Sequence, residues 1–323
     1  MYLITGCAGF IGFSMCQYLL KKRYKVIGVD NLNQYYSKEL KHERLNILKK
    51  NKNFSYQKID LCNKKKINKL LYNLNDIKII HFAAQPGVMY SYKNPKSYFD
   101  NNILATNNLV NESKKIKINQ FIFISSSSVY GDKKKYPITE NSKLSSINYY
   151  AETKNICERI VKKNQAYLSK SIKILRPFTV YGPFGRPDML ILKLLTHIKK
   201  KQKINIYNFG KYLRDFTYID DVVKIIFELS NKENRKLKIY NICASRPIEI
   251  NKILYLIKKY NKKIPIMKFM PKRKGEMLIT YGSNKKLLND IKFDKFTSVE
   301  EGLKKTIKWF KSFKNKKSLY LHK

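Results

Sequence analysis

The chain has 323 residues and a mass of 38.3 kDa, and 43% of its residues are hydrophobic, so it can bury a sizeable core as one large or two modest domains. The net charge of +44 would normally indicate a polyanionic partner, but the lysines are spread along the whole chain beside abundant Asn, Ile and Tyr, which AT-rich codons encode. We therefore attribute most of the charge to composition and expect no nucleic-acid partner. No apolar run reaches the length of a membrane span and no secretory signal is visible, which predicts a cytoplasmic protein without a membrane partner.

The N-terminal segment has the pattern of a strand, a glycine-rich turn and a helix. Residues 2–5 are apolar, residues 13–22 are amphipathic, and the glycines between them are spaced Gly-x-x-Gly-x-x-Gly, one residue wider at the start than the commonest dinucleotide pattern. Glycines allow a tight turn and the close approach of a pyrophosphate to the backbone, and a helix N-terminus attracts its charge. The segment therefore predicts a dinucleotide-binding turn. The residues expected to contact the cofactor there are Gly6, Gly9, Phe10, Ile11 and Gly12.

A second apolar strand, residues 25–29, ends at Asp30, about 20 residues beyond the glycines. A carboxylate at this place can accept the hydrogen bonds of an adenosine ribose. It would repel the additional phosphate of NADP, and the neighbouring Asn31 offers no cation to bind that phosphate. The sequence therefore predicts NAD as the cofactor, with Asp30 and Asn31 beside it.

Strand and helix signals continue to alternate up to residue 176. Repeated β–α units with short apolar strands predict an α/β fold, a doubly wound parallel Rossmann sheet that binds ligands at the carboxyl ends of its strands. The predicted strands are residues 54–59, 77–82, 120–124 and 171–175, and the predicted helices are residues 64–72, 98–115 and 148–168.

The remaining residues have a less regular pattern and predict a smaller α/β substrate domain, partly interleaved with the first. We place the NAD-binding domain at residues 1–176 and the substrate domain mainly at residues 177–323. The five cysteines are scattered and lack metal-ligand spacing, so we expect reduced buried thiols and no metal site.

Tyr150 and Lys154 lie four residues apart, on one face of a predicted helix. The Lys154 ammonium can stabilise the Tyr150 phenolate, which would lower the pKa of the tyrosine from about 10 toward a value suited to a general base. A hydroxyl from the serine run at residues 125–128 can hydrogen-bond the oxygen being oxidised. The spacing alone is weak evidence, because Tyr and Lys are abundant here. Downstream of a dinucleotide turn, it predicts the core of a nicotinamide-dependent oxidoreductase.

Seven sequence blocks carry a resemblance to a known family. They are TGCAGFIG at 5–12, DNLNQYY at 30–36, HFAAQ at 81–85, SSSSVYG at 125–131, Tyr150 with Lys154, TVYGPFGRPDM at 179–189, and RDFTYIDD at 214–221. These blocks resemble extended short-chain dehydrogenases/reductases, and more closely nucleotide-sugar 4-epimerases of the UDP-glucuronate 4-epimerase type. The last two blocks are more specific than the fold motifs and are typical of the uronate branch. The resemblance implies NAD-dependent conversion of UDP-glucuronate to UDP-galacturonate through a transient 4-keto intermediate, and a homodimer.

The same resemblance implies further cofactor contacts. Asp60 and Leu61 would flank the adenine, and Ala83 and Ala84 would line the path of the nicotinamide. Asn102 would support the active-site region, with an ordinary helix polar residue as the simpler interpretation.

For the substrate, the resemblance assigns Ser126 to the position of the family's catalytic Ser/Thr. The related sugar dehydratases have Asp and Glu at the next two positions, where this chain has Ser127 and Ser128. Dehydration is therefore disfavoured, and the two extra hydroxyls can hold a sugar carboxylate. Thr179 stands where galactose epimerases often have Asn, again as in the uronate branch.

Arg186 is expected to join these residues at the carboxylate, and Arg214 and Arg273 match positions that typically contact the diphosphate. Surface arginines are the simpler interpretation of Arg186 and Arg214. Met89 replaces an Arg that is usual in uronate epimerases, so a 4-epimerase of UDP-glucose, UDP-N-acetylglucosamine or its uronate is the alternative. A dehydratase or decarboxylase on the same fold ranks lower, and a noncatalytic NAD sensor ranks last because the Tyr/Lys pair is present.

Overall fold

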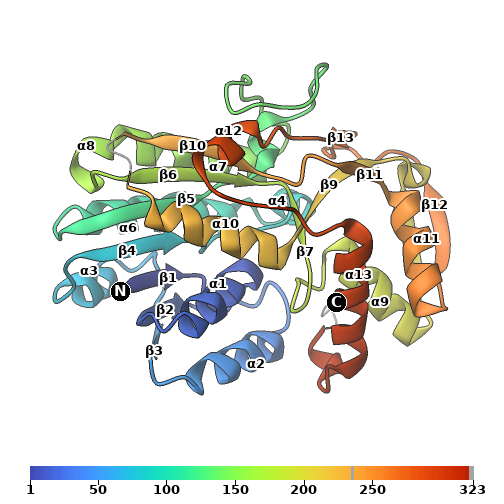
Figure 1. Ribbon diagram of the computed structural model, residues 1–323, viewed down its shortest axis with the longest axis horizontal. Helices are drawn as coiled ribbons and strands as arrows, with labels where there is room; N and C mark the ends of the chain where they lie inside the picture. Colours follow the sequence, from blue (N-terminus) through green and yellow to red (C-terminus); the bar gives the residue numbers. More distant parts are fainter. Residues whose placement is uncertain (234–235, 320–323) are drawn as a thin grey trace.

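The computed structural model describes residues 1–233 and 236–319, and its centre is a seven-stranded sheet (Figure 1). The strand order is β10-β6-β5-β4-β1-β2-β3, and each neighbouring pair is parallel. The predicted doubly wound α/β fold is therefore confirmed. The strands are β1 (Tyr2–Thr5), β2 (Val26–Asp30), β3 (Phe54–Lys58), β4 (Ile77–His81), β5 (Ile118–Ile124), β6 (Ile172–Pro177) and β10 (Lys238–Ile242).

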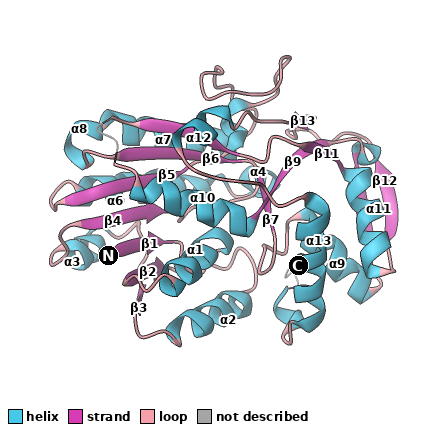
Figure 2. Ribbon diagram, in the orientation of Figure 1, coloured by secondary structure: helices cyan, strands magenta, loops and turns pink. Residues whose placement is uncertain are grey.

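The central strands are covered on both faces, which explains why apolar residues predominate in their sequences. All four residues of β1 and six of the seven residues of β5 are buried, whereas the edge strand β3 is mostly exposed. Helices α1, α2 and α10 cover one face, and α3, α6 and α7 cover the other (Figure 2). These helices are α1 (Phe10–Lys21), α2 (Lys38–Lys49), α3 (Lys64–Leu71), α6 (Ala105–Ser113), α7 (Tyr149–Lys163) and α10 (Ile219–Asn231).

The sheet has a topological switch point between β1 and β4. After β1 the chain builds β2 and β3 on one side, and it then returns to add β4 on the other side. The loops that leave the carboxyl ends of β1 and β4 therefore diverge, and a crevice opens between them. This crevice is where such a fold binds its ligand.

Residues after β6 form a smaller lobe, but β10 and α10 return to the main sheet, where β10 pairs with β6 (Figure 1). The second half of the chain is thus interleaved with the first, while a domain boundary at residues 176 and 177 stays a prediction. The strands of the lobe are β7 (Thr179–Tyr181), β8 (Lys203–Tyr207), β9 (Leu213–Tyr218), β11 (Pro247–Glu249), β12 (Ile266–Met270) and β13 (Ile279–Thr280). Its helices are α9 (Leu190–Lys200), η3 (Asn208–Gly210), α11 (Ile250–Asn261) and α13 (Val299–Ser312), whereas α12 (Lys285–Asp290) packs against β10 and η4 (Lys316–Leu319) packs against α2.

Two local differences from the predicted elements affect the site. The expected helix at 98–115 is divided, because a π-helical segment precedes α6. Helix α2 was not predicted, although Ser37 caps it by accepting a hydrogen bond from the Leu40 amide. The remaining short helices are α4 (Val88–Lys93), α5 (Pro95–Tyr98), η1 (Phe99–Leu104), η2 (Ser127–Tyr130) and α8 (Gln165–Leu168). Within residues 1–233 and 236–319, no helix is both long and apolar enough to cross a membrane.

Candidate active site

A cavity of about 1290 Å³, including space open to solvent, lies at the switch point. Its walls come from the β1–α1 turn, the carboxyl ends of β2, β3, β4 and β5, helices α2 and α7, and residues 177–189. Most of the predicted site residues line it together. These are Gly6, Gly9, Phe10, Ile11, Gly12, Asp30, Asn31, Asp60, Leu61, Ala83, Ala84, Ser126, Tyr150, Lys154 and Arg186. Residues from seven separate parts of the sequence therefore share one cavity.

The glycine turn has the geometry that a bound pyrophosphate requires. Gly6 has a φ of +73°, and a Cβ there would lie 2.8 Å from the backbone nitrogen of Ala83. A Cβ on Gly12 would collide with the carbonyl oxygen of Gly6. The first backbone hydrogen bond of α1 runs from Phe13 N to Gly9 O, so the amide groups before it face out of the helix end. The turn and its helix thus fit an anionic dinucleotide.

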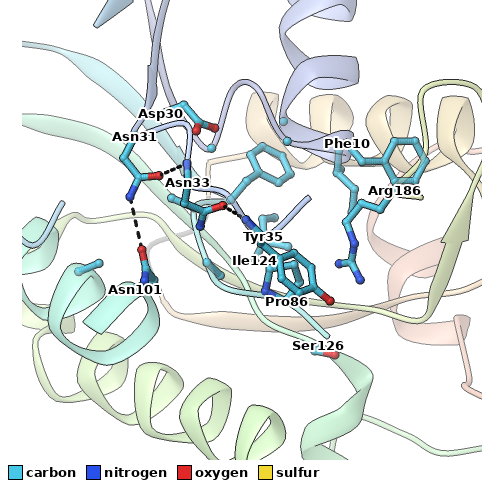
Figure 3. A pocket seen from close by; sticks show the side chains of 18 of the residues that line it. Phe10, Asp30, Asn31, Asn33, Tyr35, Pro86, Asn101, Ile124, Ser126 and Arg186 are labelled. Atoms are coloured by element: carbon cyan, nitrogen blue, oxygen red, sulfur yellow. Dashed lines mark hydrogen bonds between the residues drawn. The ribbon is translucent and has the colours of Figure 1, made fainter. Parts of the chain in front are cut away.

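Asp30 lines the cavity at the end of β2, beside the glycine turn (Figure 3). Its Oδ2 accepts a hydrogen bond from the Ala8 amide at 3.1 Å, and its Oδ1 accepts one from the Leu32 amide at 2.8 Å. These backbone bonds fix the carboxylate and leave each oxygen one further lone pair for a ribose hydroxyl. Asn31 donates from Nδ2 to Asp60 at 3.3 Å and to Asn101 at 3.4 Å, which ties together the loops at this end of the cavity.

Two cations on α2 were missed by the sequence interpretation. Lys41 lines the cavity, is 4% exposed, and donates from Nζ to the backbone and side-chain oxygens of Asn33, both at 2.7 Å. Burial lowers the pKa of Lys41 to about 8, although the charge of Asp30 raises it in part. The cap at Ser37 and the apolar spacing of α2 could have identified the helix, but not the face that it turns to the cavity.

The second of these cations, Arg44, joins the two lobes. It is fully buried and donates from Nη1 to Ala8 O and the Tyr36 hydroxyl, both at 2.7 Å. Its Nη2 donates to Phe184 O at 2.6 Å and to Gly185 O at 3.2 Å. One guanidinium therefore fixes the glycine turn against the loop that carries Arg186.

Helix α7 presents Tyr150 and Lys154 to the cavity. Asn148 caps the helix by accepting a hydrogen bond from the Ala151 amide at 2.9 Å, which places Tyr150 in the first turn. Lys154 is 3% exposed, with its Nζ 4.4 Å from the centre of the Phe123 ring. Burial lowers the pKa of Lys154 to about 8, against the electrostatic influence of Cys157 and Glu158, which raises it.

The predicted direction of the Tyr150 pKa is wrong for the protein by itself. Burial raises the pKa of Tyr150, and the influences that lower it are a hydrogen bond with Ser126 and the charge of Arg186. The loss of hydration destabilises the phenolate more than Ser126 and Arg186 stabilise it, so the pKa is raised. The four-residue spacing predicted that Lys154 lies on the same helix face as Tyr150, but a spacing gives no information on how deeply the Tyr150 hydroxyl is buried.

The serine run divides between the cavity and the structure behind it. Ser126 lines the cavity, and its Oγ donates to Ser128 Oγ at 3.1 Å and accepts from the Ser128 amide at 3.2 Å. Ser127 and Ser128 are buried in η2 and do not line the cavity. Ser125, which was not assigned a role, does line it and donates to Glu158 Oε1 at 2.7 Å.

Arg186 points into the cavity on the side opposite Asp30 (Figure 3). It donates from Nε to Asp188 Oδ1 at 3.0 Å and from Nη2 to Asp188 Oδ2 at 2.8 Å. The Tyr35 hydroxyl donates to the same carboxylate at 3.1 Å. Arg186 is therefore held as a fixed cation, within electrostatic reach of Tyr150.

Asn102 lies behind the cavity wall in the π-helical η1 and is 1% exposed. Its Oδ1 accepts from the Gln85 amide at 2.6 Å, and its Nδ2 donates to Gln85 O at 3.2 Å and to Thr153 Oγ1 at 2.9 Å. The side chain thus joins the loop after β4 to the residue before Lys154. This arrangement makes Asn102 a support of the site and not a residue of the cavity wall.

Besides Ser127 and Ser128, three predicted substrate residues lie outside the main cavity. Thr179 lines a small neighbouring pocket that also includes Arg186. Arg214 and Arg273 lie around Tyr212: the Arg214 guanidinium is 4.5 Å from the centre of its ring, and the Arg273 amide donates to its hydroxyl at 3.1 Å. Arg273 also pairs with Glu276. The two arginines predicted for the diphosphate are thus brought together in the smaller lobe.

Comparison with known proteins identifies the family. Residues 2–243 match the model of the NAD dependent epimerase/dehydratase family. The chain belongs to this family. It is 35% identical to a UDP-glucuronate 4-epimerase of Thermodesulfobacterium geofontis over 312 residues, which cover 96% of both proteins.

Solved structures of this family agree with the fold. A Tyr-to-Phe variant of the UDP-glucuronic acid 4-epimerase of Bacillus cereus, in complex with UDP-4-deoxy-4-fluoro-glucuronic acid and NAD, superposes with a TM-score of 0.90 at 32% identity and covers 96% of this chain and 98% of its own. A UDP-N-acetylglucosamine 4-epimerase of Methanobrevibacter ruminantium, in complex with UDP-N-acetylmuramic acid, gives a TM-score of 0.85 at 27% identity, with 96% and 98% covered. Epimerases of different UDP-sugars thus share this architecture.

Proposed function

We propose that the protein is an NAD-dependent 4-epimerase that interconverts UDP-glucuronate and UDP-galacturonate. The observation that carries the proposal is the position of Arg186, a cation fixed by Asp188 and Tyr35 in the same cavity as Tyr150 and Lys154. The relatives named for UDP-glucuronate epimerisation support the same substrate. The site is therefore assigned a UDP-sugar with a carboxylate.

The roles of the residues follow from their geometry. Tyr150 removes the proton of the C4 hydroxyl, and Ser126 hydrogen-bonds the oxygen from which that proton leaves. When bound, NAD would supply the hydride acceptor and donor, and the positive charge of its oxidised form would favour the phenolate. Lys154 contributes a second cation from the next turn of α7, which favours the phenolate. The reaction has no net redox change, so the cofactor is recycled.

A uronate places a special demand on the site. Its 4-keto intermediate is a β-keto acid, which loses carbon dioxide readily. Arg186, with the Thr179 hydroxyl from the neighbouring pocket, is proposed to hold the carboxylate and to retain the intermediate. Ser127 and Ser128, predicted for the same task, are buried outside the cavity wall and are not assigned it. Arg214 and Arg273 are proposed to bind the diphosphate, about which the sugar turns before it takes the hydride back on its other face.

The test is incubation of the purified protein with UDP-glucuronate, UDP-glucose and UDP-N-acetylglucosamine, each without added NAD. UDP-glucuronate should give UDP-galacturonate of unchanged mass, detected by chromatography and mass spectrometry. Loss of carbon dioxide would identify a decarboxylase, and loss of water would identify a dehydratase. Conversion of the N-acetylated sugar alone would contradict the uronate assignment.

The alternative substrate is a neutral or N-acetylated UDP-sugar, and one position favours it. Residue 89, where uronate epimerases usually carry Arg, is Met89 in helix α4. Residue 89 therefore cannot supply a cation to bind the sugar carboxylate. The similarity to a UDP-N-acetylglucosamine 4-epimerase is compatible with this alternative.

We also propose a cytoplasmic homodimer. Helices α4, η1 and α7 pack beside one another, and the side chains of Tyr92 and Phe99 on the first two are about half exposed. Exposed aromatic groups on neighbouring helices are suited to an interface between copies. Light scattering should give twice the mass of the chain, and a monomer at micromolar concentration would contradict the dimer.

A further inference from the structure

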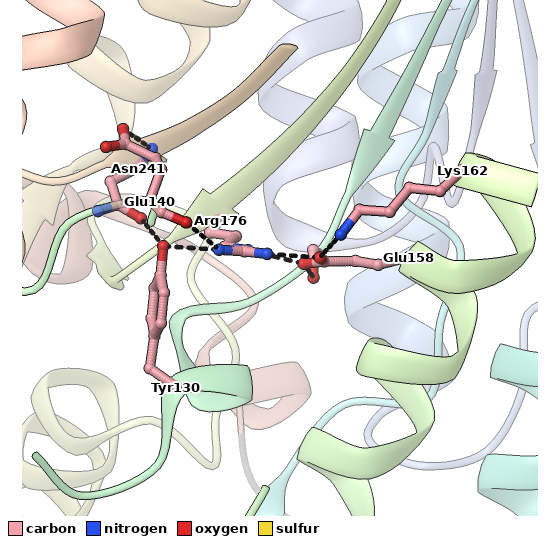
Figure 4. Close-up of polar contacts among 7 residues, drawn as sticks. Tyr130, Glu140, Glu158, Lys162, Arg176 and Asn241 are labelled. Atoms are coloured by element: carbon pink, nitrogen blue, oxygen red, sulfur yellow. Dashed lines mark hydrogen bonds and ion pairs between the residues drawn. The ribbon is translucent and has the colours of Figure 1, made fainter. Parts of the chain in front are cut away.

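A buried ion pair lies directly behind the cavity, between β6 and α7 (Figure 4). Arg176 donates from Nε to Glu158 Oε1 at 2.8 Å and from Nη2 to Glu158 Oε2 at 2.6 Å. The two side chains are 1% and 0% exposed. Burial alone would raise the pKa of Glu158, but Arg176 and Ser125 outweigh it and the pKa is lowered, so the carboxylate is charged. Because desolvation offsets much of the attraction in such a pair, stability alone does not account for it.

Glu158 connects two parts of the site. Its Oε1 accepts the hydrogen bond of Ser125, which lines the cavity and precedes Ser126 at the end of β5. Glu158 also lies one helical turn after Lys154 on α7. The same carboxylate therefore joins the strand end that carries Ser126 to the helix that carries Tyr150 and Lys154.

Arg176 fixes the other end of the serine segment. Its Nη1 donates to the Tyr130 hydroxyl at 2.8 Å, and that hydroxyl donates to Asn241 Oδ1 at 2.7 Å. Tyr130 is the last residue of η2, the short helix that begins directly after Ser126. Ser126 thus lies between two fixed residues: Ser125, which bonds Glu158, and Tyr130, which bonds Arg176. Figure 4 shows the second of these contacts.

The charge of Glu158 also acts on Lys154. The other titratable groups that interact with the ammonium are Cys157 on α7 and His81 on β4, and Tyr150 lines the same cavity. Burial, with a smaller contribution from Lys154, lowers the pKa of His81 to about 3, and burial raises the pKa of Cys157, so both are neutral near pH 7. Glu158 is thus a negative charge that favours the protonated form of Lys154.

We propose that Glu158 and Arg176 are positioning residues of the reaction, which hold Ser126 in register with Tyr150 and Lys154 and support the charge of Lys154. The proposal rests on the proposed epimerase function, because it assigns these contacts a task in proton removal. Neither residue lines the cavity, so each acts through its neighbours.

The test compares Glu158→Gln with a matched control, Glu112→Gln. Glu112, on α6, is also a buried glutamate, 1% exposed, and it pairs with Lys115 at 2.7 Å. Unlike Glu158, which bonds the cavity residue Ser125, it has no partner among the described residues that lines the cavity: its partners there are Asn68, Lys64 and Lys115. Glu158→Gln should lower kcat by about 10-fold to 100-fold, the scale for a small misplacement of reacting groups, with KM and NAD content unchanged. In the pH profile of kcat, the decline at alkaline pH should begin at a lower pH than in the wild type, because Lys154 loses a nearby negative charge and its pKa falls. Glu112→Gln should retain the wild-type kcat and pH profile.

Two further variants separate geometry from charge. Arg176→Lys keeps the positive charge and loses the two-pronged contact, so it should lower kcat without moving the decline at alkaline pH. Ser125→Ala removes only the hydrogen bond to Glu158, and it replaces Glu158→Gln as the test if that variant does not fold. Its kcat should be several-fold below that of the wild type. A folded Glu158→Gln with the kcat and pH profile of Glu112→Gln would overturn the proposal, as would an unchanged kcat in Ser125→Ala.

The charge of Lys154 can also be measured without turnover, so this inference can be tested separately from the proposed epimerase function. If the wild type converts none of the UDP-sugars, the epimerase function fails. The pH midpoint for acetylation of Lys154, followed by peptide mass spectrometry, still reports its charge. Glu158→Gln should lower that midpoint and Glu112→Gln should not. Equal midpoints in the two variants would overturn the electrostatic part of the inference.

Discussion

The two ends of the cavity are built in different ways. At the cofactor end, glycines and the first turn of α1 supply backbone groups, and Asp30 is fixed by the amides of Ala8 and Leu32. At the other end, Tyr150 and Arg186 are long side chains whose placement depends on other side chains. Backbone groups survive a side-chain substitution, whereas a side-chain network does not. Substitutions should therefore cost more at the Tyr150 end than at the Asp30 end.

The largest effect is expected from Tyr150→Phe, which removes the titrating oxygen and keeps the ring. Turnover of UDP-glucuronate should fall by about 10²-fold or more, the scale of general acid–base catalysis, while the NAD that copurifies stays at the wild-type level. Steady-state kinetics and the absorbance of released NAD measure the two quantities. Near-normal turnover would remove Tyr150 from the mechanism.

Arg186→Ala should change specificity more than overall activity. The charged hydrogen bonds proposed for the carboxylate have a typical strength that corresponds to about 10-fold to 100-fold in kcat/KM, so the ratio for UDP-glucuronate over UDP-glucose should fall by that factor. Arg159→Ala, at an exposed position of α7, is the control and should leave the ratio unchanged. An Arg186 variant with the wild-type preference would show that another group reads the sugar.

The pH dependence of kcat tests the charge of Lys154. Its pKa is lowered to about 8 by burial, so the ammonium is present below that pH and is lost as the pH rises through it. Activity should therefore decline above about pH 8, approaching about 10-fold per pH unit if the ammonium is required. NAD content measured across the same range distinguishes titration from unfolding. A flat profile to pH 10 with retained NAD would contradict the role of Lys154.

The smallest effect is expected at the cofactor end. Asp30→Ala should weaken NAD binding by about 10-fold and remove the repulsion of NADP, because the glycine turn and the α1 N-terminus still bind the pyrophosphate. Titration of the apoprotein with each cofactor gives both affinities. Wild-type protein that copurifies with NADP would refute the role of Asp30 in selecting NAD. If Asp30→Ala reduced activity more than Tyr150→Phe, the cofactor end of the cavity would be the more sensitive of the two.

The sequence was informative wherever function depends on neighbours in the chain. The spacing of Gly6, Gly9 and Gly12, the acidic end of β2 and the four-residue spacing of Tyr150 and Lys154 are local patterns, and each residue lines the cavity. A strand end or a helix face is set by residues within a few positions of it. The parallel sheet then brings all such strand ends to one edge.

Contacts between distant segments were decided only by the tertiary structure. Arg44 contacts Phe184 across 140 positions and Tyr35 contacts Asp188 across 153, and neither pair has a sequence pattern. The upward direction of the Tyr150 pKa belongs to the same class, because burial is the sum of everything packed around the phenol. The sequence by itself determined the fold and most of the chemical groups of the site, although not Lys41 of α2. Packing alone determined how those groups are held and charged, since both depend on atoms that meet only when the chain is folded.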